Sequence, residues 1–445
     1  MKQSSKLQVG VSRQCITPAL GTELYGYPSY RPASSLGDDL HVIAAAFVWG
    51  DSKAILLAAD LCNCSEAFVD KIKAEIEAKT GFPSSCMIYN VTHTHSGPYT
   101  SLRRTGWGEP NHAFLNEILL PQSVKAAVEA VSNIRPVLCG VGTTESDVGI
   151  NRRIIKPDGK VGLGQNPWGV MDKEMTVLAF KDAETDKPYL NIVHYGCHGT
   201  ASGANREISR DWPGAMKDVL ERETGALSMF LQGPIGEVGP ACPNGGTTQN
   251  YQVALELGYK AGMDAVRAWR GIKLWKDEPV HVVCGDVVVP YEPLPPREKV
   301  LEELERLGTE EELWAQEKRF DLNEYYRWKG AADAYASGTI QTHYVHKQRI
   351  FVIGDVAIVP FQFEMFLYTP LQLRRYSKFT HTLSLSVTDG DLSYLPSQDQ
   401  ICRGGYEVWS FRVGNTYKLV DNADTHLVTE NLKLLDEAYS KIQNA

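Results

Sequence analysis

His93 and His95 form the pair of side chains in this sequence best suited to hold a metal ion. They lie in the run Thr-His-Thr-His-Ser-Gly-Pro at residues 92–98, which ends an apolar, strand-like segment. Side chains two positions apart in an extended segment point to the same side, so both imidazoles are expected to face one site. Neutral imidazole is a common ligand of zinc. The pattern predicts metal ligands at the end of a strand.

Other strand ends carry further candidates. The apolar residues 189–195 predict a strand, and His198 follows it among small residues, whereas His194 within it is expected to be a buried core residue. Asp60 and Glu364 also follow apolar runs and provide carboxylates that could face the same site. These positions suit a site at one edge of a sheet.

Two further segments could support such a site. Residues 230–240 form a glycine-rich turn that includes Gly239, and its backbone N–H groups could bind an oxyanion. The turn lacks the Lys-Ser/Thr pair of a phosphate-binding loop. Asp211 is expected to cap the helix that follows it.

The sequence resembles the amidase domain of the neutral/alkaline, non-lysosomal ceramidase family, whose members hydrolyse amides with one zinc ion. The signature at residues 92–98 is the most specific match, and shorter matches extend over most of the chain. These shorter matches are residues 10–18, 151–152, 166–167, 198, 233–240, 360–374 and 389–407. The resemblance implies as zinc ligands His93, His198, Glu364 and Tyr394. It implies as substrate-polarising groups His95 and Arg152.

The chain also departs from the pattern of this family. Gly239 stands where the family turn has a serine, and Glu364 follows Pro-Phe-Gln-Phe rather than Pro-Gly. The chain ends near the end of the amidase domain, so the C-terminal β-sandwich of the ceramidases is expected to be absent. Because residues 1–7 lack the apolar core of a signal peptide, a substrate other than ceramide is expected.

Together these residues predict a zinc-dependent hydrolase that acts on a carbonyl group. Zinc lowers the pKa of a water ligand to about 7, and the expected bond is an amide of a small polar or N-acyl substrate. Asp60 or Asp211 is expected to orient a ligand histidine. Three alternatives stay open: an ester or lactone hydrolase, a metal-assisted lyase or isomerase of a sugar derivative, and an inactive ligand-binding homologue. Manganese, iron or nickel also suits such ligands.

The elements that must position these residues alternate between strands and helices. Strands are expected at residues 41–49, 54–59, 86–92, 189–195, 226–231, 281–289 and 350–360. Helices are expected at residues 65–79, 212–223 and 250–269. This order predicts an α/β fold with a layered, mixed β-sheet flanked by helices. Residues 297–336 predict an inserted hairpin of two charged helices, and residues 1–445 are expected to form a single domain.

The composition excludes several classes of partner. The 445 residues carry a formal charge of −9, which argues against a nucleic-acid partner. The sequence contains no apolar run long enough for a membrane span. Nine cysteines without paired spacing predict reduced thiols and a cytoplasmic protein. We expect a small-molecule substrate, and a homo-oligomer is compatible with the sequence.

Overall fold

An eight-stranded mixed sheet forms the centre of the computed structural model, which describes residues 7–101 and 108–443. In spatial order its strands are β12 (Leu227–Gln232), β10 (Pro188–Tyr195), β9 (Glu174–Asp182), β6 (Arg135–Glu145), β1 (Gln8–Cys15), β3 (His41–Trp49), β4 (Ser52–Ala59) and β5 (Met87–Val91). Pairs β4–β5 and β10–β12 are parallel and the other pairs are antiparallel. The two edge strands, β12 and β5, also contact each other. The backbone N–H of Gln232 in β12 donates to Asn90 Oδ1 in β5 at 2.8 Å. Residues 1–6, where a signal peptide would begin, lie outside the described residues.

Strand β3 from Val42 to Phe47 and strand β4 from Ala54 to Ala59 are continuously apolar because both faces of these segments are buried. In β3, Val42, Ala44 and Ala46 pack with helices α1 (Glu66–Thr80) and α2 (Leu120–Ser132). The alternate residues Ile43, Ala45 and Phe47 pack on the other face of the sheet. Side chains of a strand alternate between its two faces, so a strand buried on both faces has no polar positions. Both predicted strands are confirmed, and they pair with each other as an antiparallel hairpin.

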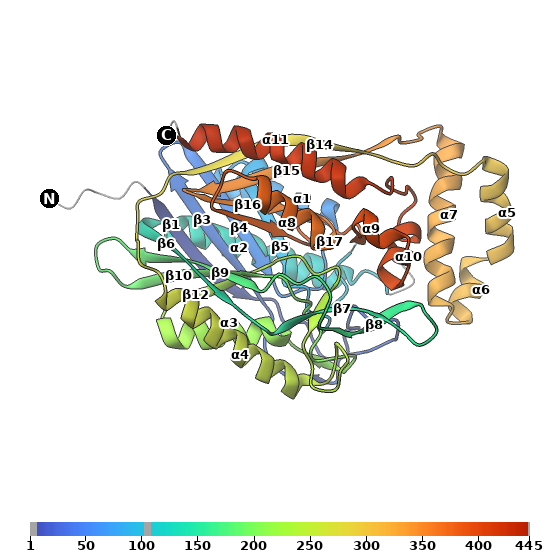
Figure 1. The fold of residues 1–445 in the computed structure, drawn as a ribbon, viewed down its shortest axis with the longest axis horizontal. Coiled ribbons are helices and arrows are strands. Elements are labelled where there is room, and N and C mark those ends of the chain that lie inside the picture. The colour runs from blue at the N-terminus through green and yellow to red at the C-terminus, as the bar shows by residue number, and fades with distance from the viewer. Residues whose placement is uncertain (1–6, 102–107, 444–445) are drawn as a thin grey trace.

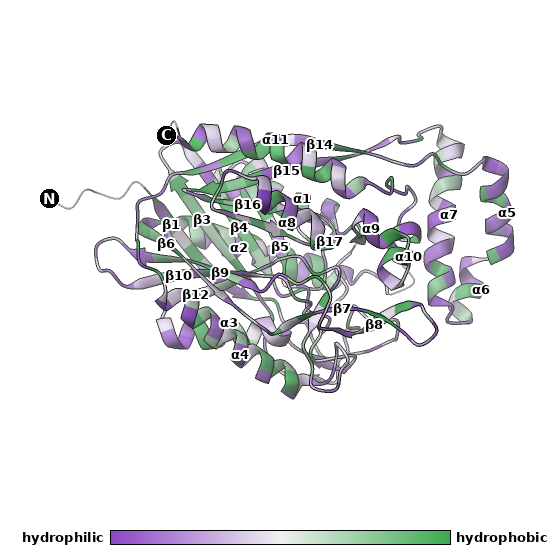
Figure 2. Ribbon diagram, in the orientation of Figure 1, coloured by the Kyte–Doolittle hydropathy of each residue, from purple (hydrophilic) through white to green (hydrophobic). Residues whose placement is uncertain are grey.

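A second sheet packs on the face of the first sheet that carries Ile43, Ala45 and Phe47. Its order is β14 (Val280–Pro290), β15 (His343–Ile353), β16 (Val356–Pro360) and β18 (His381–Leu385), and Figure 2 shows hydrophobic residues concentrated in the strands. The single strand predicted at residues 350–360 is wrong. Gly354, with a φ of 53°, turns the chain between β15 and β16, and the apolar residues on either side pair with each other.

Helices cover the outer faces of both sheets, so the predicted α/β fold with a layered, mixed sheet is confirmed (Figure 1). Helices α3 (Asp211–Thr224) and α4 (Tyr251–Arg270) pack on β9, β10 and β12. The second sheet is covered by α8 (Tyr368–Tyr376), α10 (Tyr406–Val413) and α11 (Ala423–Gln443). No helix within residues 7–101 or 108–443 is both long and apolar enough to cross a membrane. All nine cysteines are free thiols.

The charged segment forms three helices rather than the two expected from the sequence. Helices α5 (Arg297–Leu307), α6 (Glu310–Ala315) and α7 (Arg319–Ser337) stand together at one end of the molecule (Figure 1). Thr309 and Glu312 form a capping box, which starts α6 as a separate helix. Val300 of α5 and Trp328 of α7 lie in a small core of their own.

Short elements complete the fold and carry several candidate site residues. They form small sheets of β2 (Ser35–Leu36) with β11 (Glu207–Ile208), of β13 (Val238–Pro240) with β7 (Gly149–Ile155) and β8 (Val161–Asn166), and of β17 (Glu364–Met365) with β19 (Tyr394–Leu395). The remaining helical turns are η1 (Ser84–Cys86), η2 (Phe114–Leu119) and α9 (Gln398–Ile401).

Candidate metal centre

Three side chains from distant parts of the chain meet at one point. His93 follows β5, His198 follows β10, and Glu364 begins β17. His93 Nε2 lies 3.7 Å from Glu364 Oε1, and His198 Nε2 lies 3.0 Å from Glu364 Oε2. One ligand atom of each side chain lies within 4.8 Å of the others, which is the arrangement of a candidate metal site. The loops meet because His95 donates its backbone N–H to Gly199 O at 3.1 Å.

Backbone carbonyls fix the orientation of both histidine rings. Cys62 O lies 2.7 Å from His93 Nδ1, and Val238 O lies 3.0 Å from His198 Nδ1. A carbonyl accepts a hydrogen bond only from a protonated nitrogen, so each Nε2 of a neutral ring keeps its lone pair. Burial and the charge of Arg152 lower the pKa of His198 well below its ordinary value, which keeps that ring neutral. Histidines that ligate metals are held in the same way.

The donor set fits a cation. Glu364 Oε2 is buried and accepts no hydrogen bond from any described residue, although His198 Nε2 is close to it. An unpaired buried carboxylate oxygen is costly, and a cation between it and the two imidazoles would compensate it. Cys62, with His93 and His95, forms a second group of ligand atoms. Burial and Glu364 raise the pKa of the Cys62 thiol, which disfavours the thiolate that binds metals.

His93 and His95 lie close together because of a backbone conformation that the sequence did not predict. His93 has a φ of 59°, so the segment is not extended there, and the expected extended geometry is wrong. His95 Nε2 nevertheless lies 3.1 Å from His93 Nε2. His95 is buried, and burial together with the nearby His93 and His198 lowers its pKa well below the ordinary value. A neutral His95 therefore stands beside the candidate ligands.

Arg152, on β7, lies against the same site and is held from several sides. Its Nε donates to Glu407 Oε1 at 3.0 Å, and its Nη2 donates to Gly236 O at 2.9 Å and to Tyr394 Oη at 3.1 Å. Burial opposes its charge, but Tyr394, Glu407 and Glu364 together raise the pKa of Arg152. The guanidinium is thus a fixed positive charge beside the candidate ligands.

Tyr394 reaches the site through a two-residue parallel sheet. It pairs in register with Glu364, which places the two side chains next to each other. Burial and Glu364 raise the pKa of Tyr394 well above its ordinary value, so the phenol is neutral in the absence of a cation. The ring of Tyr406 lies 5.6 Å from that of Tyr394. Sequence reasoning missed Tyr406 and Glu407 as site residues, although both fall within the matched residues 389–407.

The remaining predicted residues lie around this group. Asp60 forms a buried ion pair with Lys217 at 2.7 Å, away from the candidate ligands. Asp211 has a φ of 54° and begins α3, and its carboxylate accepts the N–H groups of Ala201 and Ser202 in the loop after His198. It therefore supports this loop. The cap position before α3 is Arg210 rather than Asp211, but Asp211 Oδ1 also accepts the backbone N–H of Trp212 in the first turn at 2.8 Å. Orientation of a ligand histidine by either aspartate stays a prediction.

Gly239 lies in β13 beside β7 and leaves no room for a side chain. A Cβ atom there would lie 2.8 Å from Thr247 Cγ2 and 2.9 Å from Thr247 Cβ. Contacts this short require the neighbouring side chain to move. The side chain of Thr247 therefore occupies the space next to Gly239.

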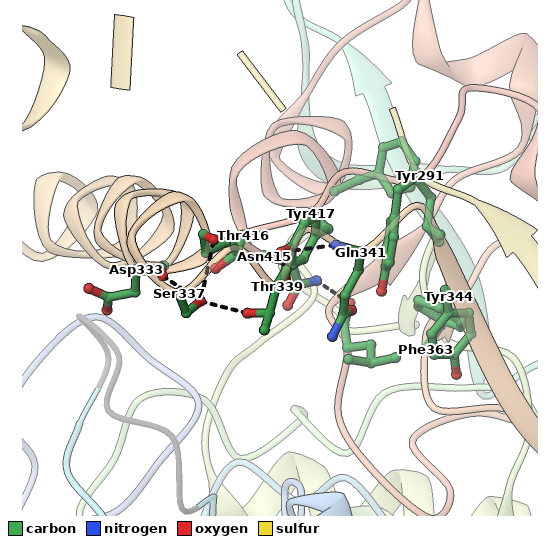
Figure 3. A pocket seen from close by; sticks show the side chains of 15 residues that line it. Tyr291, Asp333, Ser337, Thr339, Gln341, Tyr344, Phe363, Asn415, Thr416 and Tyr417 are labelled. Carbon is green, nitrogen blue, oxygen red and sulfur yellow. Dashed lines mark hydrogen bonds between the residues drawn. The ribbon is translucent and has the colours of Figure 1, made fainter. Parts of the chain in front are cut away.

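The candidate metal ligands line a cavity of about 380 Å³ together with His95 and Arg152, and we call it the histidine cavity. Its other lining residues include Tyr25, Tyr27 and Trp409, and α7 contributes Phe320 and Asn323. A second cavity of about 530 Å³ lies between α7 and residues 415–419, which follow α10 (Figure 3). We call it the Tyr417 cavity. Asn415 lines both cavities, so the two adjoin.

Comparison with known proteins identifies the relatives of this chain. A neutral ceramidase from Pseudomonas aeruginosa has a similar structure, with a TM-score of 0.74 and 18% sequence identity over 100% of this chain and 75% of the other. A ceramidase complexed with C2 gives a TM-score of 0.70 and 17% identity over 99% of this chain and 76% of the other. No curated protein matches the sequence.

The sequence itself matches the family description "Neutral/alkaline non-lysosomal ceramidase, N-terminal" over residues 7–244. His93, His95, Arg152, His198 and Gly239 lie within the matched residues. Glu364 and Tyr394 come from the part of the chain beyond them. The match covers more than half of the chain, which therefore belongs to the neutral/alkaline non-lysosomal ceramidase family and is a hydrolase.

Proposed function

We propose that this protein is a zinc-dependent hydrolase that cleaves the amide bond of a small polar or N-acyl substrate. The observation that carries the proposal is the convergence of His93, His198 and Glu364, with both Nδ1 atoms held by carbonyls. These three side chains would hold the ion, with Tyr394 as a fourth ligand. When bound, zinc polarises a carbonyl oxygen and makes a water molecule acidic enough to react at neutral pH.

Arg152 and His95 supply the remaining chemistry in this proposal. Arg152 keeps its charge and is held by Glu407, so it is suited to stabilise the negative charge that develops on the carbonyl oxygen. His95 is neutral, and its buried Nδ1 has no hydrogen-bond partner among the described residues. A neutral imidazole next to the reacting bond is suited to accept a proton and pass it to the departing amine.

One observation favours a second candidate, a homologue that binds its ligand without cleaving it. Gly239 and the adjacent Thr247 leave no space for the serine that the family resemblance implies at this position. If that hydroxyl is required for amide cleavage, this chain would keep the metal and the cavity and lose the reaction. The two candidates predict the same zinc content and different turnover.

The test combines metal analysis with a panel of carbonyl substrates. The purified protein is loaded with zinc and assayed with N-acyl amides, esters, lactones and ceramide. We expect one zinc per chain and hydrolysis of short N-acyl amides. His198→Ala should lose both the zinc and the hydrolysis, whereas the matched control His343→Ala, at an exposed position, should keep both. Zinc binding without hydrolysis of any substrate would favour the binding homologue, and full zinc content in His198→Ala would contradict the metal site.

The same proposal treats residues 1–445 as one catalytic domain. The residues offered as ligands range from His93, after β5, to Tyr394, in β19. A boundary between these elements would divide the proposed site. Residues 297–336 are an excursion from this domain, and Phe320 and Asn323 of α7 add to the wall of the histidine cavity.

A further inference from the structure

Asn63 and Asp391 form a polar pair in the wall of the histidine cavity that the proposed reaction does not use. Asn63 follows β4 and is buried, and Asp391 precedes β19. Asn63 Nδ2 donates to Asp391 Oδ2 at 2.5 Å, although 328 residues separate the two in the sequence. Both line the cavity together with His93 and Glu364. The fold therefore brings a second carboxylate into the cavity that holds the candidate ligands.

The orientation of this pair is fixed. The hydroxyl of Thr100 donates to the backbone carbonyl of Asn63 and lies 3.4 Å from its Oδ1. The amide NH₂ group of Asn63 is therefore the end that faces Asp391. The backbone N–H of Ser393 lies 3.5 Å from Asp391 Oδ1. An ionised carboxylate can accept about four hydrogen bonds, so Asp391 keeps acceptor positions for a group inside the cavity.

Burial and the nearby Glu364 raise the pKa of Asp391, and no positively charged side chain among the described residues is paired with it. Three charged side chains are found among the described residues that line the histidine cavity, namely Arg152, Glu364 and Asp391. Arg152 is paired with Glu407, and Glu364 faces the histidines. Within the described parts of the chain, no lysine, arginine or histidine forms an ion pair with Asp391. A carboxylate removed from water without a cation is costly, and a cationic ligand would repay that cost.

Aromatic rings surround the same space. Tyr25, Tyr27, Tyr406 and Trp409 all line the cavity. Burial, Tyr99 and Asp391 together raise the pKa of Tyr25 well above its ordinary value, so its ring is a neutral phenol within electrostatic range of Asp391. The faces of tyrosine and tryptophan rings attract ammonium groups. A carboxylate among neutral aromatic rings is thus suited to bind an organic cation.

We propose that Asn63 and Asp391 form a specificity site that binds an ammonium group on the substrate, near the bond that is cleaved. The proposal rests on the hydrolase function proposed above and names a substrate class for it, amides of diamines and similar cationic amides. Asp391 receives the ammonium group, and Asn63 is a positioning residue that orients the carboxylate.

The test compares three amides with the same acyl group, made from ethylenediamine, ethanolamine and propylamine. These carry an ammonium, a hydroxyl and a methyl group at the same position. We expect the kcat/KM of the ethylenediamine amide to exceed that of the propylamine amide by about 10- to 100-fold, the range of a charged hydrogen bond. Asp391→Asn, which keeps the size of the side chain, should remove this preference, and the exposed control Asp51→Asn should retain it.

The possible outcomes distinguish a failure of the ammonium site from a failure of the proposed hydrolase function. Equal kcat/KM values for all three amides, a preference for ethanolamine, or an unchanged preference in Asp391→Asn would overturn the inference while hydrolysis still supports the function. If no amide is hydrolysed, the proposed function fails, and calorimetry with free ethylenediamine and propylamine then decides. Tighter binding of the diamine that is lost in Asp391→Asn would support the ammonium site, and equal affinities would overturn it. Thermal melting of Asp391→Asn verifies that the variant is folded.

Discussion

The two adjoining cavities differ in how their polar groups are satisfied. In the Tyr417 cavity the side chains of Ser337, Thr339, Asn415 and Tyr417 form hydrogen bonds with each other or with the backbone (Figure 3). The hydroxyls of Ser337 and Thr339 lie 2.6 Å apart, and Tyr417 Oη accepts the backbone N–H of Gln341 at 3.3 Å. In the histidine cavity, by contrast, Glu364 Oε2, His95 Nδ1 and Tyr27 Oη are buried without a hydrogen-bond partner in the described structure.

This difference in hydrogen bonding distinguishes the two cavities better than their volumes of about 530 and 380 Å³ do. Leaving a buried polar group unpaired costs about 1–3 kcal/mol of folding free energy. A fold tolerates several such groups in one place when a ligand satisfies them. The unpaired groups in the histidine cavity are consistent with the ligand site proposed above.

The largest expected effect comes from removing a candidate metal ligand. In His198→Ala we expect the bound zinc to be lost and hydrolysis to fall at least about 100-fold, because even indirect partners of metal ligands are worth 10- to 100-fold. Ser337→Ala in the Tyr417 cavity should leave both unchanged. Metal analysis and initial rates measure the two variants, and equal losses in both would break the distinction between the cavities.

Arg152→Lys should have the next largest effect. Lysine keeps the positive charge but cannot donate at once to Glu407, Gly236 O and Tyr394, as the guanidinium does. We expect kcat to fall about 100-fold with zinc content unchanged, as for the loss of an oxyanion donor. A rise in KM with an unchanged kcat would instead assign Arg152 to substrate binding alone.

His346, which bonds to Tyr344 behind the Tyr417 cavity, should affect stability rather than activity. Burial lowers its pKa from 6.5 to about 4, so the native state binds fewer protons than the unfolded state between these values. Its contribution is present above pH 6.5 and is lost as the pH falls to about 4, a total of about 3 kcal/mol. Urea unfolding across this range should show a shallower pH dependence in His346→Gln. The same pH dependence in both proteins would refute the assignment.

The smallest effect is expected from a matched pair of tyrosine substitutions, which compares a bonded hydroxyl of the Tyr417 cavity with an unbonded hydroxyl of the histidine cavity. Tyr344→Phe removes the hydroxyl that donates to Gln362 Oε1 at 2.7 Å and should destabilise the protein by about 1–3 kcal/mol. Tyr27→Phe removes a hydroxyl with no partner in the described residues, so the free energy of unfolding should stay the same or rise. Chemical denaturation measures both, and a larger loss in Tyr27→Phe would reverse the argument.

The sequence predicted well those features that depend on neighbouring residues. The continuous apolar runs of β3 and β4 indicated buried strands, and the run at residues 92–98 indicated a histidine site directly after β5. The family resemblance added Glu364 and Tyr394, which no local pattern selects. The apolar run at residues 350–360 predicted one strand, although Gly354 and Asp355 interrupt it and such a Gly-Asp pair between apolar segments is typical of a hairpin turn.

The partners that complete the site were not predictable, because each lies far away in the sequence. Glu407, which holds Arg152, is 255 residues from it, and Asp391 is 328 residues from Asn63. Such pairs depend on how the sheet edges and the C-terminal loops come together. The local pattern of a single sequence does not indicate which distant residues come into contact.

The sequence by itself therefore determined the α/β class, the kind of chemistry and the two principal histidines. Their residue types and the elements before them are local properties of the chain. Only the tertiary structure decided that His93, His198 and Glu364 converge, that His95 reaches His93 through a left-handed turn, and which buried polar atoms lack a partner. The convergence of these side chains and the hydrogen bonding of buried polar atoms both depend on long-range packing. This packing places atoms from separate strands within hydrogen-bond distance of each other.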